Sequence, residues 1–525
     1  MQRRIYLIIL LLPFLWVACN SEKESKVHKN KIDKNFVYIK DKRFFLNDTV
    51  FFPMMINYGL LTYTYNGTPL IVDVNAKIPS KIHNVEDFQK KMFRTIDAHL
   101  KIIKDLGFNS LRLYGVTRFL RDNNKLYINE ILDEKNTPLL RKLNEYFVLL
   151  DQVFELAKKN ELKVMFLFAN DGIEIPDYDE FRIEVLKHYS NNNTIFSYDF
   201  FNEPLYFDKI LERPKKNAYK VVQKWKNMMS KYAPKQLLTI GLSEPIEVFE
   251  WDPSILPVDF ISFHTYDILR IPSEIFWYSR YAHKVWMIGE TGLAADNDSV
   301  SFEKQKKFME KTYQYAINCG AAGFGIWQFQ DVNWGSWRSG HKGLFTFYGD
   351  TTINGVKIKG RLKPAAFIIK KLKKIKPEEP CQMPNNYFNM RDYHKFLIKG
   401  YVFDANSKKP INGAVIRGWT KDWKLGTNTY TDSTGKFLLF SDWKFVHIRI
   451  SAPGYSTVKF DRYNINYKES PYVKNKYVFL DSVSRMYKNY VNSKMYEFNK
   501  SDFYAYKYSG LLDTVFLEKI DFKNL

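Results

Sequence analysis

The sequence has 525 residues, of which 45% are hydrophobic and 26% are charged. This length exceeds that of one ordinary domain, and the composition is that of a folded globular protein, so extensive disorder is excluded. The net charge of +22 is spread along the chain rather than gathered in blocks, which argues against a nucleic-acid-binding protein.

The N-terminus has the features of an export signal. Arg3 and Arg4 precede an apolar run, Ile5–Ala18, that is too short to span a bilayer comfortably. The run ends in Leu15-Trp16-Val17-Ala18-Cys19, which resembles a bacterial lipobox and implies lipidation of Cys19 after removal of residues 1–18. Residues 19–35 then form a polar tether, and we expect a lipid-anchored protein of the cell envelope, on the periplasmic or outer side of the outer membrane. The alternative is a plain signal peptide with an incidental cysteine.

Short apolar segments alternate with amphipathic helical patterns over residues 36–376, after a hairpin of Phe36–Ile39 and Phe44–Leu46. The expected strands are Phe51–Ile56, Ser110–Tyr114, Lys163–Phe168, Ile195–Phe201, Leu237–Ile240, Phe260–Phe263, Val285–Ile288 and Gly323–Trp327. The expected helices are Val85–Leu106, Leu139–Lys159, Lys215–Tyr232, Ser273–His283, Phe302–Asn318 and Pro364–Ile375. The alternation predicts an α/β fold, a (β/α)8 TIM barrel. An open doubly wound sheet is the alternative.

The pattern changes after the linker of residues 377–396, which begins with Pro377-Glu378-Glu379-Pro380. Five short strands are expected at Leu397–Phe403, Ala414–Trp419, Thr429–Thr431, Lys436–Phe440 and His447–Ser451. They predict a small all-β sandwich, Ig-like or transthyretin-like, over residues 397–480. The motifs Gly400-Tyr-Val-Phe-Asp404, Thr431-Asp432-Ser-Thr-Gly435 and Pro453-Gly454-Tyr455 resemble those of carboxypeptidase-regulatory-like domains, which implies a non-catalytic module. Residues 481–525 match no pattern.

Two cysteines, Cys319 and Cys381, remain in the expected mature chain. A disulfide between them and a pair of free buried thiols are both open, because two cysteines alone do not define a disulfide framework.

Two apolar runs end in a glutamate where barrel enzymes place their chemistry, at the C-terminal ends of strands. Ile195–Phe201 leads into Asn202-Glu203-Pro204, and Val285–Ile288 leads into Gly289-Glu290-Thr291-Gly292. Three βα units of about 30 residues fit between the two glutamates, which places them on the fourth and seventh strands, facing each other. Glycoside hydrolysis needs such a pair, with one carboxyl protonated and the other ionised.

No competing chemistry is indicated by the sequence. It contains no His-Glu-x-x-His or Cys-x-x-Cys pair, no Gly-x-Ser-x-Gly elbow and no dinucleotide fingerprint after a strand. We therefore expect no metal and no cofactor.

These motifs resemble the cellulase-like glycoside hydrolases of family 5, over roughly residues 36–376. The resemblance implies that Glu203 is the general acid/base and Glu290 the nucleophile of a retaining enzyme, with carboxyl groups roughly 5–5.5 Å apart. It further implies binding or orienting roles for five residues at strand ends: Arg112 beside Glu290, Asn202 on the sugar 2-hydroxyl, His264 near the acid/base or the substrate, Tyr266 on Glu290, and Trp327 as the floor of the sugar subsite.

Each assignment has a structural alternative. Glu203 could start a helix, Glu290 could cap the next segment, Arg112 could be an ion-pair partner, and the side chains of His264, Tyr266 and Trp327 could be packing residues. Trp334 and Trp337 could line further subsites or anchor a loop, and Asn170, Asp171 and Tyr58 are only candidate contacts. The family's usual histidine after the third strand is missing from Phe166-Leu-Phe-Ala-Asn170-Asp171, which leaves the exact family and the substrate open.

The sequence therefore predicts a retaining glycoside hydrolase whose partner is a β-linked glycan of the glucan or mannan type, in endo or exo mode. A glycan-binding surface protein without turnover is an alternative that the intact glutamate pair disfavours. A transglycosylase that uses the same two glutamates is another.

Overall fold

The computed structural model describes residues 32–130, 137–168, 175–268, 270–296, 298–383, 396–441, 443–462, 464–469 and 508–521. The export signal, Cys19, Asn170 and Asp171 lie outside these ranges, and what the sequence predicts for them stays a prediction. From Lys34 onward the chain forms one compact unit, Lys34–Leu525. None of the helices described there combines the length and the hydropathy needed to cross a bilayer.

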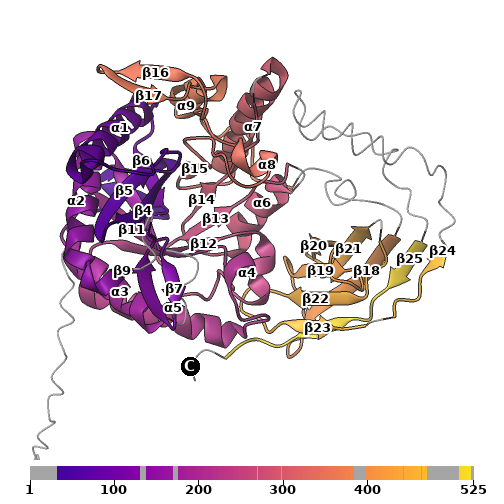
Figure 1. Ribbon diagram of the computed structural model, residues 1–525. Coiled ribbons are helices and arrows are strands. Elements are labelled where there is room, and N and C mark those ends of the chain that lie inside the picture. Colours follow the sequence, from indigo (N-terminus) through magenta and orange to yellow (C-terminus); the bar gives the residue numbers. More distant parts are fainter. Residues whose placement is uncertain are drawn as a thin grey trace, which may run out of the picture. The chain divides into compact units, whose positions relative to one another are not determined.

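Eight parallel strands form a closed barrel, because the last of them pairs with the first (Figure 1). Each strand lies beside the next in chain order. They are β4 (Met54–Tyr65), β6 (Ser110–Tyr114), β10 (Lys163–Leu167), β11 (Ile195–Asn202), β12 (Leu237–Leu242), β13 (Ile261–His264), β14 (Trp286–Glu290) and β15 (Phe324–Ile326). This confirms the predicted TIM barrel and excludes the open sheet.

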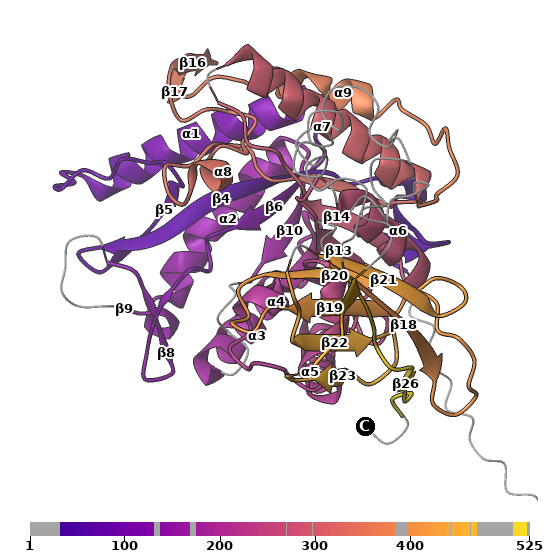
Figure 2. The ribbon, with the colours of Figure 1, turned by 90° about the vertical axis from the view of Figure 1, so that its right-hand side faces the viewer.

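Helices surround the barrel (Figure 2). They are α1 (Val85–Leu106), η1 (Leu139–Arg141), α2 (Leu143–Lys159), α3 (Pro176–His188), α4 (Pro204–Phe207), α5 (Lys215–Tyr232), η2 (Pro245–Phe249), α6 (Ile271–Tyr281), α7 (Ser299–Asn318), α8 (Trp337–Gly340), η3 (Pro364–Ile368) and α9 (Ile369–Leu372). Helix α3 was not predicted, although its buried side chains recur at helical spacing, because one of them is the charged Arg182, which interrupts the apolar stripe formed by Tyr178, Phe181, Val185 and Leu186.

Helix α1 shows why its bounds follow from the sequence. The Asn84 side chain accepts a hydrogen bond from the backbone N–H of Asp87, which satisfies one free donor of the first turn. Gly107 ends the helix with φ of 107°, a conformation that glycine adopts without steric cost. Between these caps, Met92, Ile96 and other apolar side chains at helical spacing are buried against the barrel.

Hairpins extend the barrel in ways that the sequence analysis did not anticipate. Strand β4 continues past its predicted end and turns back as β5 (Thr68–Asp73). The turn residues Asn66 and Gly67 both have positive φ, as a two-residue turn between antiparallel strands requires. Asn-Gly also joins β16 to β17, so this dipeptide was a usable signal. The small strands are β1 (Tyr38–Lys40), β2 (Arg43–Leu46), β3 (Thr49–Val50), β7 (Leu120–Asp122), β8 (Lys125–Ile128), β9 (Thr137–Pro138), β16 (Asp350–Ile353) and β17 (Val356–Lys359).

The interior of the barrel is apolar at one end and polar at the other. At the end where the strands begin, the β1–β2 hairpin inserts Phe44, whose ring lies 5.0 Å from that of Phe260. Met55 and Met287 belong to the same buried cluster. The polar side chains of the barrel interior therefore collect at the opposite end, where the strands finish.

The C-terminal part is a two-sheet sandwich made of residues 396–469 and 508–521, which confirms the predicted fold class. Its strands are β18 (Phe396–Asp404), β19 (Val415–Trp419), β20 (Gly426–Tyr430), β21 (Lys436–Ser441), β22 (His447–Ser451), β23 (Val458–Phe460), β24 (Lys468–Glu469), β25 (Tyr508–Leu511) and β26 (Val515–Leu517). Strands β25 and β26, from the unassigned tail, pair in parallel with β18. Such pairing between distant segments leaves no local sequence pattern.

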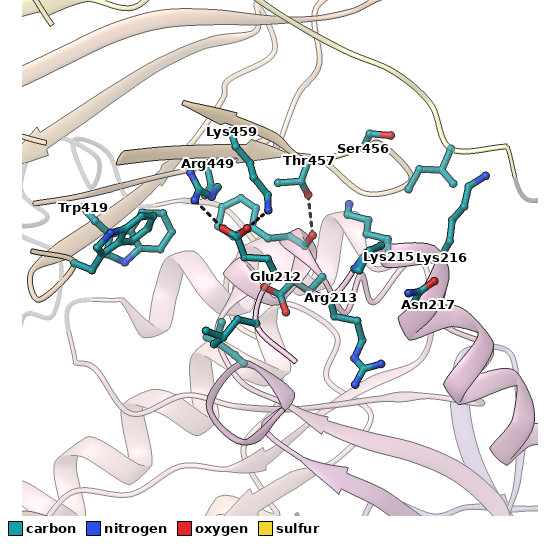
Figure 3. A pocket seen from close by; sticks show the side chains of 17 residues that line it. Glu212, Arg213, Lys215, Lys216, Asn217, Trp419, Arg449, Ser456, Thr457 and Lys459 are labelled. Carbon is teal, nitrogen blue, oxygen red and sulfur yellow. Dashed lines mark hydrogen bonds and ion pairs between the residues drawn. The ribbon is translucent and has the colours of Figure 1, made fainter. Parts of the chain in front are cut away.

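Barrel and sandwich are joined by specific polar contacts. The buried Lys215 ammonium donates to Asp252 and to the Ala452 carbonyl, at 2.9 and 3.0 Å. Around this contact lies a cavity of about 1020 Å³, lined by α4–α5 residues of the barrel and by β19 and β22–β23 residues of the sandwich (Figure 3). Cys319 and Cys381 form a disulfide, which decides between the two alternatives that the sequence left open.

Candidate active site

The two glutamates lie at the polar end of the barrel. Glu290 is the last residue of β14, and Glu203 directly follows β11. One carboxylate oxygen of each, together with a ring nitrogen of His264, lie within 4.8 Å of one another. The Glu203 side chain is 17% exposed and that of Glu290 is 6% exposed. The two carboxyl groups thus share one space that solvent reaches mainly beside Glu203.

The Arg112 guanidinium binds Glu290 and three other polar side chains beside the two carboxyl groups. Its buried guanidinium donates to Asp199 Oδ2 at 2.9 Å, to Asn57 Oδ1 at 3.0 Å and to Asn202 Oδ1 at 2.7 Å, and it forms an ion pair with Glu290 Oε1. A buried guanidinium needs such partners, because an unpaired charge in the interior is costly. Neither Asp199 nor Asn57 was predicted from the sequence to lie at the site.

Glu290 accepts hydrogen bonds at both oxygens. Arg112 donates to Oε1, and the Tyr266 hydroxyl donates to Oε2. Burial holds the pKa of Tyr266 well above its usual value, so this hydroxyl remains a donor. A carboxylate held by a cation and a phenol is fixed in orientation and suited to carrying a negative charge.

Glu203 has a different environment. Burial raises its pKa to about 7, against the opposing positive charges of Arg112 and Lys342, and Glu244 raises it further. Its Oε1 lies 2.8 Å from His264 Nδ1. Burial lowers the pKa of His264 to about 4, so this ring is neutral near pH 7. A neutral imidazole can accept a hydrogen bond from a protonated carboxyl and donate one to an ionised carboxylate. His264 can therefore pair with Glu203 in either protonation state of that carboxyl.

The backbone at Glu203 is held in an uncommon conformation. Its φ of 46° and ψ of 67° lie in the left-handed region, which costs energy for a residue with a side chain. The backbone N–H of Glu203 donates to the Gly241 carbonyl at 2.6 Å, which ties the turn to β12. Pro204 then begins the short helix α4. Such strain is found preferentially at functional sites.

Two glycines make room for the side chains beneath the carboxylates. A Cβ on Gly241 would lie 2.9 Å from the His264 ring and 3.0 Å from Arg112 Nη2. A Cβ on Gly289 would lie 2.2 Å from Ser262 Oγ. Both positions are therefore restricted to glycine by the packing of His264 and its neighbours, a requirement that no local pattern reveals.

Trp327 follows β15 at the same end of the barrel. It stacks on Tyr114, with ring centroids 4.9 Å apart, and the buried Tyr114 hydroxyl donates to Gln328. The Trp327–Gln328 peptide bond is cis. The stack supports the Trp327 ring from one side, as a flat wall of a sugar subsite requires.

The remaining candidates have varied positions. Tyr58 is not brought to the site: it is buried, and its hydroxyl lies 3.1 Å from His99 Nδ1. Trp334 and Trp337 are 45% and 55% exposed on the segment after β15, so both of their alternatives remain open.

A residue missed by the sequence analysis lies on the same segment. The Lys342 ammonium lies 3.6 Å from the centroid of the Tyr266 ring. The segment is anchored by Lys363, which donates to Asp331 Oδ1 at 2.8 Å and to the His341 carbonyl at 3.1 Å. Lys342 lies in an irregular loop, far in sequence from the strand ends, where no spacing rule applies.

Glu203, His264 and Glu290 could together offer three ligand atoms to a metal ion. However, His264 Nδ1 is within hydrogen-bonding distance of Glu203, and both Glu290 oxygens accept hydrogen bonds from Arg112 and Tyr266. A metal ion would have to displace these donors and would face the Arg112 charge. The arrangement therefore fits acid–base chemistry better than a metal centre.

Comparisons with known proteins give no match to a family model and none to a curated protein. Solved structures do match. A family 5 mannosidase from Rhizomucor miehei is 14% identical with a TM-score of 0.42, over 65% of this chain and 97% of that chain. An exo-β-1,4-mannosidase from Opitutaceae bacterium strain TAV5 is 13% identical with a TM-score of 0.44, over 73% and 67%. An endo-1,4-β-mannanase from Rhizomucor miehei is 15% identical with a TM-score of 0.38, over 56% and 90%.

Proposed function

We propose that the protein is a retaining glycoside hydrolase, in which Glu290 is the nucleophile and Glu203 the general acid/base. One observation carries this proposal: two carboxyl groups face each other at the mouth of a barrel in contrasting environments. Burial raises the pKa of Glu203 to about 7, whereas Glu290 accepts hydrogen bonds from Arg112 and Tyr266. Groups whose environments differ in this way can act as acid and nucleophile at the same pH.

In the first step, Glu290 Oε attacks the anomeric carbon while the protonated Glu203 gives its proton to the departing glycosidic oxygen. The C–O bond to the leaving group breaks, and a glycosyl ester with Glu290 forms. In the second step, Glu203, now ionised, removes a proton from water, and the resulting hydroxyl displaces Glu290. The first configuration is restored after two inversions.

The separation of the carboxyl groups supports retention. Their nearest described oxygens lie within 4.8 Å. Retaining enzymes hold the two carboxyl groups about 5–5.5 Å apart, whereas inverting enzymes leave roughly 6.5–9.5 Å for a water molecule.

The surrounding side chains support a sugar as the substrate. Asn202 is fixed by its hydrogen bond from Arg112 and directly precedes Glu203, and we expect its side chain to bind the hydroxyl next to the anomeric carbon. Trp327, braced by Tyr114, offers an apolar face for a pyranose ring. We propose a β-linked polysaccharide or oligosaccharide as the substrate, of the glucan or mannan type that the sequence resemblance implies.

We further propose that the protein is exported and lipid-anchored to the cell envelope through Cys19. The support is the charged and apolar N-terminal pattern followed by Ala18-Cys19. Labelling with a palmitate analogue should modify the wild-type protein and leave a Cys19→Ser variant unlabelled.

The enzyme assay uses aryl β-glycosides and a panel of polysaccharides with product sizing, which also separates hydrolysis from sugar transfer. We expect wild-type turnover, with the β-anomer as the first product by proton NMR. Glu290→Ala should lose about 10⁴-fold or more in kcat, whereas Glu303→Ala, at an exposed position on α7, should match the wild type. Equal activity of wild type and Glu290→Ala, or an inverted first product, would contradict the mechanism.

A further inference from the structure

Lys342 places a positive charge beside the proposed nucleophile. Its ammonium lies 3.6 Å from the centroid of the Tyr266 ring, and the Tyr266 hydroxyl donates to Glu290. Arg112 already forms the ion pair with Glu290 from below. Lys342 is thus a second cation at the site and is not needed to hold Glu290 in place.

Lys342 is partly buried, and in the described part of the chain its ammonium has no polar partner, in contrast to the buried Lys363 and Lys215. Lys363 donates to Asp331 and to two carbonyls, and Lys215 donates to Asp252 and one carbonyl. Among the described residues, the Lys342 ammonium has no hydrogen-bond acceptor and no ion pair within 4.0 Å. An ammonium carries three hydrogen-bond donors, and its partial burial without acceptors costs free energy. A group that arrives with the substrate would supply what is missing.

The segment that carries Lys342 has the composition of a surface for acidic sugars. Residues 332–343 include the cations Arg338 and Lys342 and contain no aspartate or glutamate. Two exposed tryptophans, Trp334 and Trp337, offer flat apolar faces of the kind on which sugar rings stack. The acid that precedes them, Asp331, is buried and paired with Lys363. The free charge of this segment is therefore positive.

We propose that Lys342 binds the anionic group of an acidic sugar in the subsite beside Glu290, so that the glycan cleaved contains uronic acid or sulfated units. This rests on the proposed glycosidase function and narrows its substrate to β-linked glycans that carry acidic units, so that unsubstituted, neutral glucans and mannans become the poorer substrates. With a carboxylate or sulfate the ammonium forms an ion pair as well as a hydrogen bond, whereas a neutral hydroxyl offers only the hydrogen bond. The same cation offsets the repulsion between an anionic substrate and Glu290.

The experiment compares kcat/KM for an aryl β-glucuronide, an aryl 6-sulfo-β-glucoside, an aryl β-glucoside and an aryl β-mannoside. Lys342→Met removes the charge at similar length, and Lys342→Arg keeps it. We expect Lys342→Met to lower kcat/KM for an anionic substrate about 10–100-fold more than for the neutral ones. Lys342→Arg should regain part of that loss. The anionic substrate that the wild type prefers identifies the carboxylate or the sulfate as the recognised group.

A second measurement needs no variant at the site. The KM of the wild type for the anionic substrate should rise with ionic strength more steeply than that for a neutral substrate. Lys357→Met, on the exposed β16–β17 hairpin, is the matched control for Lys342→Met and should behave as the wild type in both measurements.

Equal losses on all four substrates in Lys342→Met, or a wild-type preference for the neutral glycosides, would overturn the proposal. Both outcomes require turnover, so they leave the glycosidase function standing. Absence of turnover on every aryl glycoside and polysaccharide would instead contradict the proposed function itself.

Discussion

Two regions of the molecule hold glutamates in opposite environments, and only one has the layout of an active site. At the barrel mouth these are Glu203, whose pKa burial raises to about 7, and Glu290. In the cavity between barrel and sandwich they are Glu250, whose pKa burial also raises to about 7, and Glu212, whose pKa is lowered mainly by its hydrogen bond from Lys459. A glutamate whose pKa is raised by burial, beside a second glutamate held by cations, therefore does not by itself identify a catalytic pair.

The difference lies in what the ionised glutamate does. Glu212 is 49% exposed and is held by Arg449 and Lys459, both from the sandwich, so its oxygens are used in the contact between domains (Figure 3). Glu290 is 6% exposed and is held from below, and its carboxylate lies within 4.8 Å of a second carboxyl group. A carboxylate that is fixed in place and still faces its partner can react with a bound substrate.

The largest effect in this comparison is expected at Glu203, and none at Glu250, although burial raises the pKa of both to about 7. Glu203→Ala should reduce kcat/KM by about 10²–10⁴-fold for substrates with poor leaving groups, which need a proton from the acid. The loss should be smaller for the glycosylation step of activated aryl glycosides. Glu250→Ala is the matched control, and its kinetics should stay close to those of the wild type. Losses that do not depend on the leaving group would argue against the acid role of Glu203.

A tenfold effect per pH unit is expected from the protonation of Glu203. The first step needs the protonated carboxyl, so kcat/KM should fall about tenfold for each pH unit above about 7.

Because burial raises the pKa of Glu203 above its value in the unfolded chain, protonation of Glu203 also stabilises the folded state. That contribution is complete below the unfolded pKa and is lost as pH rises through about 7.

Folding must therefore be followed along the same pH series. Circular dichroism at each pH separates loss of structure from loss of activity. Burial also raises the pKa of Glu250 to about 7, so Glu250→Gln removes one source of pH-dependent stability. It should leave the alkaline limb of the activity profile in place, whereas Glu203→Gln should abolish that limb. An unchanged limb in Glu203→Gln would assign it to another group.

The barrel and the residues at its strand ends could be predicted from the sequence, because both depend on local patterns. Helices α1 and α5 have the predicted bounds, since the apolar spacing of both and the caps of α1 are local features of each segment. The positions of Glu203 and Glu290 followed from apolar runs that end in an acid. The pairing of β25 and β26 with β18 could not be predicted, because it joins segments that are distant in the sequence.

The residues that hold the two glutamates in place could be predicted from the sequence only in part. Asp199 and Asn57 each interrupt an apolar strand, and a polar residue in a buried strand is itself a signal that a partner is required. That partner, Arg112, was identified for a different reason. The need for glycine at 241 and 289 depends on how His264 packs, and the role of Lys342 depends on the path of a loop. These are properties of the folded structure.

The smallest effect in the comparison is expected at the contact between the domains. Glu212→Gln removes the charge that pairs with Arg449 and Lys459. Glu212 is half exposed and the buried Arg449 keeps its ion pair with Asp461, so the free energy of unfolding should fall by less than about 1 kcal/mol. The matched buried change is Asp199→Ala, which leaves the fully buried Arg112 without one of its partners and should cost about 3–5 kcal/mol. Chemical denaturation measures both. A cost at Glu212 as large as that at Asp199 would mean that the cavity contact governs folding, and the cavity would then be as rigidly organised as the barrel mouth.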